Sequence, residues 1–257
     1  MESKLMPVIF VGHGSPMNAI EDNEFSLVWE ALGRKLPKPR AIVCISAHWE
    51  TEGPRVTAME KPRTIHDFGG FPRELFEMQY PAPGSTELAD SIIKTIKAPE
   101  IKPDQQWGLD HGAWSVLCRM FPKADIPVIQ FSLDRTRSGD YHYSLGAQLK
   151  FLRKQGVLII GSGNIVHNLQ IMDWAGTAFD WASEFDEKAK NWILDENHKP
   201  LIHYEKQGQS GVLAINSGEH YLPLLYVLGA QEKGEPVEFF NESIFAGSLS
   251  MRGLVIG

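Results

Sequence analysis

The sequence predicts an α/β fold in which a central, mostly parallel β-sheet of mixed character is flanked by helices. Short β-branched runs alternate with amphipathic stretches, which is the rhythm of βαβ units. The alternation continues through all 257 residues without an internal repeat or a Pro/Gly/Ser-rich linker, and 43% hydrophobic residues are enough for a continuous core. We therefore expect one domain over residues 1–257.

The first half of the chain begins the alternation. Strands are predicted over 7–13 ("PVIFVGH") and 41–48 ("AIVCISAH"), and helices over 26–36 and 85–97. Ser85 is placed to cap the second of these helices, because its hydroxyl can accept a hydrogen bond from a free backbone N–H.

The second half continues in the same way. Helices are expected over 113–121, 140–155, 178–196 and 219–230, and strands over 126–133 and 157–164. Gly156 can end the helix over 140–155. The alternating segments 236–243 and 247–257 predict a closing antiparallel strand pair at an edge of the sheet.

Charge and apolar run length exclude several classes of partner. A formal net charge of −7 argues against nucleic acid and anionic membranes as partners, because both favour a basic face. The apolar runs are far shorter than the roughly 20 residues that span a bilayer, and "MESKLMP" lacks the apolar core of a signal peptide. We expect a cytoplasmic protein. Cys44 and Cys118 lie in apolar runs and are expected to be small buried side chains.

Histidines occupy the ends of several predicted strands. His13 ends the strand over 7–13, His48 ends the strand over 41–48, and His167 follows the strand over 157–164 closely. Ligands of open α/β sheets bind outside the carboxyl ends of the strands, so these three side chains should face one crevice. His220, at the start of a predicted helix, can face the same crevice.

Each of these histidines alone is best explained as an ordinary, partly buried side chain. Four of them on separate rigid elements favour a metal site instead, because imidazole is a common ligand of zinc, iron and copper. The neighbouring glycines at 12, 14, 161 and 163 allow close approach of the backbone, although a simple turn also explains them.

The other five histidines have less definite roles. His111 follows Asp110, which could orient its ring, and a role near the site and a structural role are equally consistent with the sequence. His66 lies in "TIHDFGGFP", a loop that could cover a pocket for an aromatic ligand, and we favour a packing role for it. Surface positions are expected for the remaining three, His142, His198 and His203.

Motifs for other chemistries are incomplete. In the G-x-G-x-x-G pattern, Met17 and Val166 occupy the place of the third glycine, so dinucleotide binding is weakly supported. Neither a G-x-S-x-G elbow nor an H-E-x-x-H motif is present, and Ser15 is better explained as a hydrogen-bonding turn residue than as a nucleophile.

Six blocks in order resemble one family, the 4,5-DOPA extradiol dioxygenase-like proteins, which belong to the class III extradiol ring-cleavage dioxygenases of the LigB-type superfamily. The resemblance runs from about residue 8 to the C-terminus. The blocks are "FVGHGSPMNAIED", "VCISAHWET", "TIHDFGGFP", "WGLDHGAWSVL", "GSGNIVHNL" and "EHYLPLLYVLGA".

The resemblance implies a single catalytic α/β domain with one divalent metal ion in the crevice. It makes His13, His48 and His220 metal ligands. His167 takes the position of the family's acid/base histidine and is also a candidate fourth ligand. His111 resembles an additional active-site histidine that contacts substrate or oxygen.

The third ligand position departs from the wider class, which generally uses two histidines and a glutamate. Glu219 adjoins His220, and on a helix its side chain would point about 100° away. An all-histidine set binds zinc readily, so we expect Zn²⁺ in the isolated protein and Fe²⁺ as the working metal.

The implied reaction is extradiol cleavage of a DOPA-like catechol by O2 to a ring-opened semialdehyde, with His167 or His111 as proton donor. The alternatives are a zinc protein of this fold with hydrolase activity or none, and a tetrapyrrole metal chelatase, which shares only the "VGHGS" block. Arg63 and Arg73 are no better than surface arginines as partners of a substrate carboxylate. We expect a monomer or a small homo-oligomer.

Overall fold

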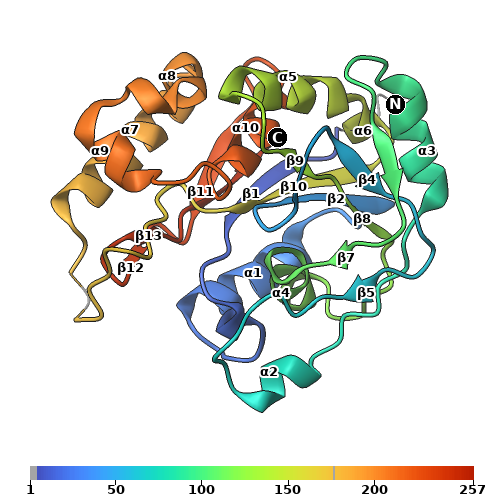
Figure 1. The fold of residues 1–257 in the computed structure, drawn as a ribbon, viewed down its shortest axis with the longest axis horizontal. Helices are drawn as coiled ribbons and strands as arrows, with labels where there is room; N and C mark the ends of the chain where they lie inside the picture. Colours follow the sequence, from blue (N-terminus) through green and yellow to red (C-terminus); the bar gives the residue numbers. More distant parts are fainter. Residues whose placement is uncertain (1–4, 176) are drawn as a thin grey trace.

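A six-stranded sheet forms the centre of the structure, a computed structural model that describes residues 5–175 and 177–257 (Figure 1). The strand order is β11-β14-β1-β10-β2-β8. Four central strands are parallel: β1 (Val8–Gly12), β10 (Val157–Gly163), β2 (Ala41–Ser46) and β8 (Val128–Gln130). Antiparallel strands β14 (Gly253–Ile256) and β11 (Val237–Phe240) complete one edge. The expected mixed, mostly parallel sheet and its closing strand pair are confirmed.

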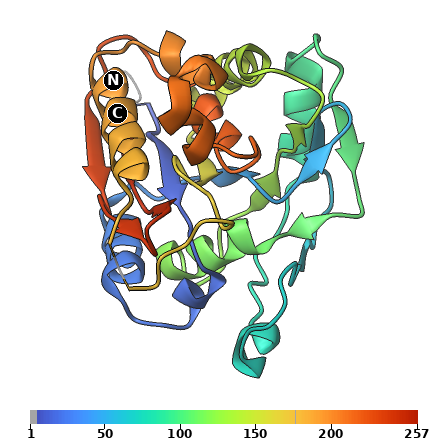
Figure 2. The same ribbon diagram turned by 60° about the vertical axis from the view of Figure 1, so that its left-hand side comes forward.

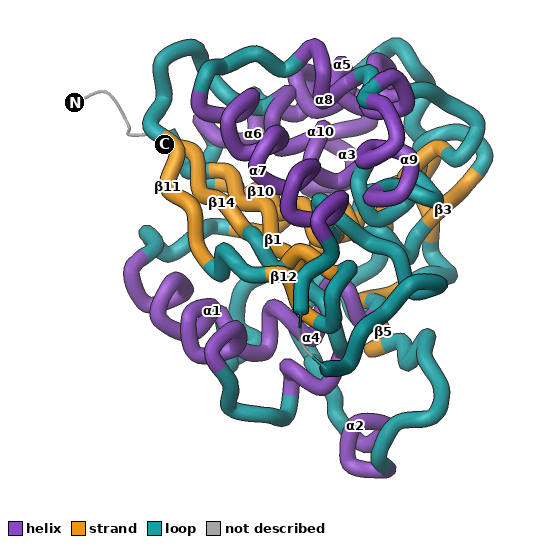
Figure 3. Tube along the Cα trace, turned by 90° about the vertical axis from the view of Figure 1, so that its left-hand side faces the viewer, coloured by secondary structure: helices purple, strands orange, loops and turns teal. Residues whose placement is uncertain are grey.

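Helices cover both faces of this sheet. Helices α1 (Glu24–Lys35) and α4 (His111–Met120) lie on one face (Figure 3). The opposite face is covered by α3 (Thr86–Thr95), α5 (Gly139–Leu149), α6 (Phe151–Lys154), α7 (Asp180–Leu194) and α10 (Leu222–Gly229). Successive strand residues point to opposite faces, so Phe10 joins the core beneath α10 and Ile9 joins the core beneath α1.

Local capping sets several helix ends. The hydroxyl of Ser85 accepts a hydrogen bond from the backbone N–H of Leu88, as the sequence predicted. Gly156 has a φ of +73°, which suits glycine and ends the α5–α6 segment. Helix α1 begins two residues earlier than expected, because the side chain of Asn23 caps it through the backbone N–H of Phe25 and of Ser26.

Many short elements were not predicted, because segments of two to seven residues carry too little periodicity and depend on tertiary contacts. The short helices are η1 (Pro16–Ala19), α2 (Arg73–Glu77), α8 (Lys199–Ile202), η2 (Tyr204–Lys206) and α9 (Gly208–Ala214). Figure 2 shows α2 standing away from the rest of the chain.

The strands outside the main sheet form four small pairs. These pairs are β3 (Glu50–Thr51) with β9 (Leu133–Asp134), β4 (Arg55–Thr57) with β6 (Lys102–Asp104), β5 (Arg63–Thr64) with β7 (Gly108–Leu109), and β12 (Ile244–Phe245) with β13 (Leu249–Ser250). The single strand expected over 126–133 is therefore divided between β8 and β9.

The surface position expected for His142 is wrong. Its side chain is fully buried between α5 and α10, where Nδ1 lies 3.1 Å from the hydroxyl of Tyr226. Burial lowers the pKa of His142 to about 4. The polar sequence around it did not reveal that this face of α5 packs against α10. His198 and His203 are partly buried.

Two other expectations can be compared with the structure. Cys44 is fully buried, whereas Cys118 is only partly buried. None of the helices in the described ranges has both the length and the apolar character needed to cross a membrane. Residues 1–4, the start of the segment considered as a targeting signal, lie outside the described residues.

Candidate metal centre and active site

His13 and His48 meet at the carboxyl edge of the parallel strands. Strand β10 lies between β1 and β2, and its hydrogen bonding continues past the strand ends. The backbone N–H of His13 donates to the carbonyl of Gly163 (3.0 Å), and that of Ala47 donates to the carbonyl of Ser162 (3.0 Å). This framework places the Nε2 atoms of the two histidines 3.1 Å apart.

His220 reaches the same point from the turn before α10. Its carbonyl accepts a hydrogen bond from the backbone N–H of Asn164 (2.8 Å). A Cβ atom at Gly163 would lie 2.0 Å from the same carbonyl oxygen, so only glycine permits this approach. One ligand atom from each of His13, His48 and His220 lies within 4.8 Å of the other two.

His167 lies against His220. Its backbone N–H donates to the carbonyl of Ala214 (2.9 Å), and the two imidazole rings are stacked with centroids 3.5 Å apart and planes 5° from parallel. His167 and His220 also form a possible ligand group with Glu219. The structure thus brings together all four histidines that the sequence assigned to one crevice.

An oxygen atom lies near the far nitrogen of each converging imidazole. Ser162 donates its hydroxyl proton to the carbonyl of Gly112 (2.5 Å), so its oxygen accepts from Nδ1–H of His13 at 3.1 Å. This fixes the tautomer in which Nε2 of His13 carries a free lone pair. Nδ1 of His220 lies 3.0 Å from a carboxylate oxygen of Glu219, and Nδ1 of His48 lies 3.6 Å from one of Asp67.

These donors fit a divalent metal ion. Protein metal sites commonly hold the second ring nitrogen of each ligating histidine with an oxygen, which leaves the first nitrogen free for the ion. Burial, followed by the neighbouring imidazoles, holds the pKa of His13 and of His48 well below the ordinary value. Burial and His220 lower the pKa of His167 to about 3. Neutral imidazoles, the form that ligates, are therefore favoured at neutral pH.

The direction expected for Glu219 is wrong. Residues 219–221 form a turn rather than the first turn of a helix, so the carboxylate contacts the ring of His220 instead of pointing away. Burial raises the pKa of Glu219, but hydrogen bonds from His220 and Ser217 outweigh it and lower the pKa to about 2. Glu219 is therefore an anion that can accept Nδ1–H of His220.

His111 also lies at the site, but Asp110 does not orient it. His111 is the first residue of α4, and its ring centroid is 3.9 Å from that of His48. Asp110 instead caps α4 through the backbone N–H of Ala113 and accepts a hydrogen bond from the hydroxyl of Ser46 (2.6 Å). The carboxylate beside the His111 ring belongs to Asp67, whose only signal in the sequence was its place in the "TIHDFGGFP" block.

A cavity of about 880 Å³ opens over these histidines. Its wall is largely apolar and includes Phe68 and Phe71, so the "TIHDFGGFP" loop does line a pocket. His66 packs outside the wall, with Nε2 2.9 Å from the carbonyl of Met78. The other large apolar side chains of the wall are Met17, Phe25, Leu169, Met172, Trp174, Phe245, Leu249 and Met251.

The charged side chains of the cavity wall, apart from the histidines, are all acidic. Glu21 and Glu24 contribute carboxylates, and among the described lining residues there is neither a lysine nor an arginine. Arg63 and Arg73 are not part of the wall, and Arg73 pairs with Glu77 on α2. The sequence did not indicate these two glutamates or the apolar residues from 169 to 174 as pocket residues.

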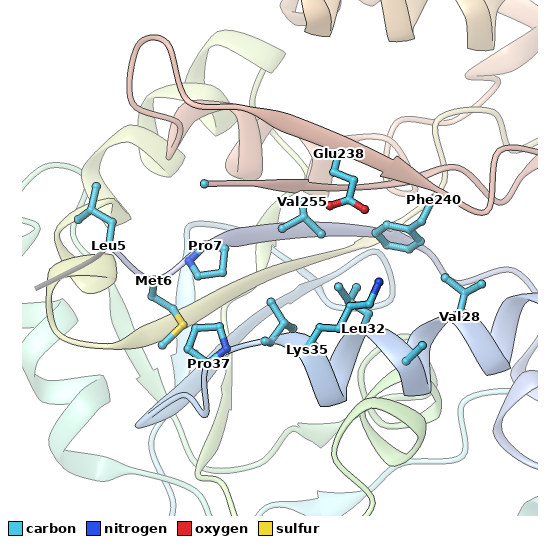
Figure 4. A pocket seen from close by; sticks show the side chains of 13 residues that line it. Leu5, Met6, Pro7, Val28, Leu32, Lys35, Pro37, Glu238, Phe240 and Val255 are labelled. Atoms are coloured by element: carbon cyan, nitrogen blue, oxygen red, sulfur yellow. The ribbon is translucent and has the colours of Figure 1, made fainter.

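A second cavity, of about 440 Å³, lies between α1 and the strands β11 and β14 (Figure 4). Its wall is mostly aliphatic, with Lys35 and Glu238 as its charged side chains. None of the site histidines contributes to its wall.

Known proteins of one family match nearly the whole chain. Residues 7–249 match the family described as the catalytic LigB subunit of aromatic ring-opening dioxygenase. A 4,5-DOPA dioxygenase extradiol of Escherichia coli K12 is 46% identical, with 100% of this chain and 97% of the relative covered. The protein of the same name from Beta vulgaris is 37% identical, over 97% of this chain and 96% of the relative.

A solved structure gives the same result for the fold. A crystal structure of an Escherichia coli K12 protein described as uncharacterized is 42% identical, with a TM-score of 0.85 and coverage of 98% of this chain and 100% of the other. The family match extends far beyond the "VGHGS" block on which the chelatase alternative depended. The chain therefore belongs to the LigB family of aromatic ring-opening dioxygenases.

Proposed function

We propose that this protein, as one catalytic domain over residues 1–257, is an extradiol dioxygenase that inserts both atoms of O2 into a DOPA-like catechol and yields a ring-opened semialdehyde. One observation carries the proposal: the ligating nitrogens of three imidazoles converge under a cavity with an aromatic wall. The names of the relatives from Escherichia coli and Beta vulgaris support the substrate class.

We assign the metal to His13, His48 and His220, whose ligand atoms form one compact group. His167 lies beside this group and is a fourth ligand or an acid/base residue. When bound, Fe²⁺ would supply the electron transfer between catechol and O2 that zinc, without an accessible redox change, does not supply. Three nitrogen ligands also suit Zn²⁺, which we expect in the protein as isolated.

Proton transfer is assigned to His111 and His167. Both line the cavity, and both lie outside the three-residue ligand group. The carboxylate of Asp67, 3.0 Å from Nδ1 of His111, favours a proton on that nitrogen by its charge. Nε2 can then accept a proton from a catechol hydroxyl. His167 is the second imidazole on the wall. It can accept the second hydroxyl proton of the catechol and return that proton to an oxygen of the product.

The apolar wall serves substrate binding. Phe68 and Phe71 offer aromatic faces and edges to a catechol ring, and such contacts contribute about 0.5–1.5 kcal/mol per ring pair beyond area burial. The same side chains keep water from the reacting ring. A volume of about 880 Å³ leaves room for a substituent beyond the ring, as in DOPA.

Oxygen uptake tests the proposal. The metal-free protein is loaded anaerobically with Fe²⁺, its occupancy is measured, and DOPA and a panel of simpler catechols are added with air. We expect oxygen consumption with formation of a yellow product, and neither in a His13→Ala variant. Absence of uptake with every catechol at confirmed iron occupancy would rule the function out.

The all-nitrogen donor set favours one alternative, a zinc protein of the same fold with hydrolase activity or none. The same experiment separates the two. A protein that holds Zn²⁺ tightly but consumes no oxygen after exchange to Fe²⁺ is the zinc protein, whereas turnover that follows iron occupancy identifies the dioxygenase.

A further inference from the structure

We propose that Asp67 is a positioning residue that orients two histidines of the site at once, His48 and His111. The inference deepens the proposed function and rests on it, because His48 is a proposed metal ligand and His111 a proposed proton acceptor. Asp67 lies in the loop between β5 and α2, far in sequence from both histidines.

The two oxygens of this carboxylate face different rings. Oδ1 lies 3.0 Å from Nδ1 of His111 and accepts the backbone N–H of the same residue at 2.9 Å. Oδ2 lies 3.6 Å from Nδ1 of His48, which is an ion-pair distance and longer than a hydrogen bond. The two imidazoles are neighbours, with centroids 3.9 Å apart and planes inclined by 44°. One side chain therefore borders the outer nitrogen of both rings.

Asp110 cannot replace Asp67 as the carboxylate beside these two rings. The carboxylate of Asp110 is committed to Ser46, the backbone of Ala113, Gln130 and Trp107. The side chain of Asp67 is 19% exposed and that of His111 is 8% exposed, so water screens their contact weakly. The weakly screened negative charge of Asp67 therefore favours a proton on the Nδ1 atom of each ring and an orientation in which that atom faces the carboxylate.

The loop that carries Asp67 is also held by hydrogen bonds of Ile65. Removal of the Asp67 side chain should therefore leave the start of this loop in place. The backbone N–H of Ile65 donates to the carbonyl of Leu109 (2.7 Å), and the indole N–H of Trp114 donates to the carbonyl of Ile65 (2.8 Å). Phe68, next to Asp67, packs edge-on against His111 with centroids 5.5 Å apart. The local effect of an Asp67 variant should therefore be reorientation of His48 and His111.

Metal titration tests this role without any need for turnover. We compare Asp67→Asn and Asp67→Ala with a matched control, Asp104→Asn. Asp104 is the last residue of β6, and its carboxylate also accepts backbone N–H groups and pairs with an arginine. Zn²⁺ affinity is measured by competition with a chelator, and Co²⁺ is added to record the absorption spectrum of the ligand field.

For Asp67→Ala we expect Zn²⁺ affinity to fall by about 10- to 100-fold and the Co²⁺ spectrum to change, because outer partners of metal ligands have effects of this size. Asp104→Asn should retain both properties. Asp67→Asn keeps one acceptor oxygen for His111 but places an amide N–H₂ beside His48, so its metal affinity should also fall. With Fe²⁺ loaded to equal occupancy, kcat should fall in both Asp67 variants while KM for the catechol changes little.

Unchanged Zn²⁺ affinity and an unchanged Co²⁺ spectrum in folded Asp67→Ala would overturn the inference, as would equal losses in Asp104→Asn. Affinities are referred to the folded fraction measured by circular dichroism, so simple destabilisation is not scored as loss of positioning. If the iron-loaded parent protein oxidises no catechol, the proposed function fails, and the Zn²⁺ and Co²⁺ measurements still decide the role of Asp67.

Discussion

The imidazole of His167 lies flat on that of His220, with centroids 3.5 Å apart and planes 5° from parallel. His220 is a proposed metal ligand and His167 a proposed acid/base residue, so this pair joins the two proposed roles. A ligand and a proton-transfer residue at this position predict different metal contents for a His167→Ala variant.

Replacement of His167 by alanine separates ligation from proton transfer. The three-residue ligand group does not include His167, so His167→Ala should keep most of its metal and lose most of its turnover, by about 100-fold or more for loss of an acid/base residue. Metal content by elemental analysis and oxygen uptake measure the two quantities. Retained turnover would refute the acid/base role, and loss of metal equal to that of His13→Ala would make His167 a ligand.

Ser162 is predicted to support metal binding through the tautomer of His13. Ser162→Ala removes the acceptor of Nδ1–H, so Nε2 is no longer the favoured site of the free lone pair, and metal affinity should fall by about tenfold or more. Ser115→Ala is a matched control, because this buried hydroxyl makes no hydrogen bond within the described part of the chain. Chelator competition gives both affinities, and equal values for the two variants would contradict the prediction.

The charge of the cavity wall predicts a preference among catechols. Glu21 and Glu24 should favour a catechol with an ammonium group over a neutral one, and disfavour one whose substituent is a carboxylate. Both glutamates are exposed, so we expect KM differences of only about two- to threefold, reduced at high salt.

KM values for 4-(2-aminoethyl)catechol, 4-ethylcatechol and 3-(3,4-dihydroxyphenyl)propionate measure this preference. It should disappear in the double variant Glu21→Gln, Glu24→Gln and persist in Glu100→Gln, which alters an exposed carboxylate away from the cavity. A preference that survives in the double variant would show that other groups select the substrate.

Buried His142 predicts a pH dependence of stability. Burial lowers its pKa to about 4 in the folded protein, whereas the unfolded chain has the ordinary value near 6.5. Above pH 6.5 the imidazole of His142 is neutral in both the folded and the unfolded protein. Between pH 6.5 and pH 4 it binds a proton in the unfolded chain but stays mostly neutral in the folded protein. The free energy of unfolding should therefore fall by up to about 3 kcal/mol between pH 6.5 and pH 4 on account of this residue.

Urea unfolding of the parent and of His142→Gln over this pH range measures the effect. The parent and the variant share all other histidines. The difference between their curves of unfolding free energy against pH therefore isolates the contribution of His142. The glutamine variant should lose less stability on acidification. Parallel curves would show that His142 does not titrate as its burial implies.

Some of the site was predictable because it depends on strand ends. His13, His48 and His167 follow short apolar runs whose β-branched residues predict buried strands, and the carboxyl ends of parallel strands meet at one edge. The α/β class and the edge position of the last two strands followed from the same local patterns. His220 was less certain, since only its place before an apolar helix suggested that it faces the crevice.

Other features depend on how distant segments pack, which no local pattern contains. The placement of β10 between β1 and β2 brings the histidines into contact, and the packing of α5 on α10 buries His142. The turn at 219–221 aims Glu219 at His220, and the loop after β5 brings Asp67, rather than the adjacent Asp110, to the ring of His111.

The sequence by itself therefore determined which imidazoles stand at the sheet edge, because strand burial and alternation are local properties of the chain. The tertiary structure alone decided which carboxylates face those imidazoles. Loop carboxylates are placed by contacts between residues far apart in sequence, and a carboxylate next to a histidine in the chain can be held by a helix N-terminus instead.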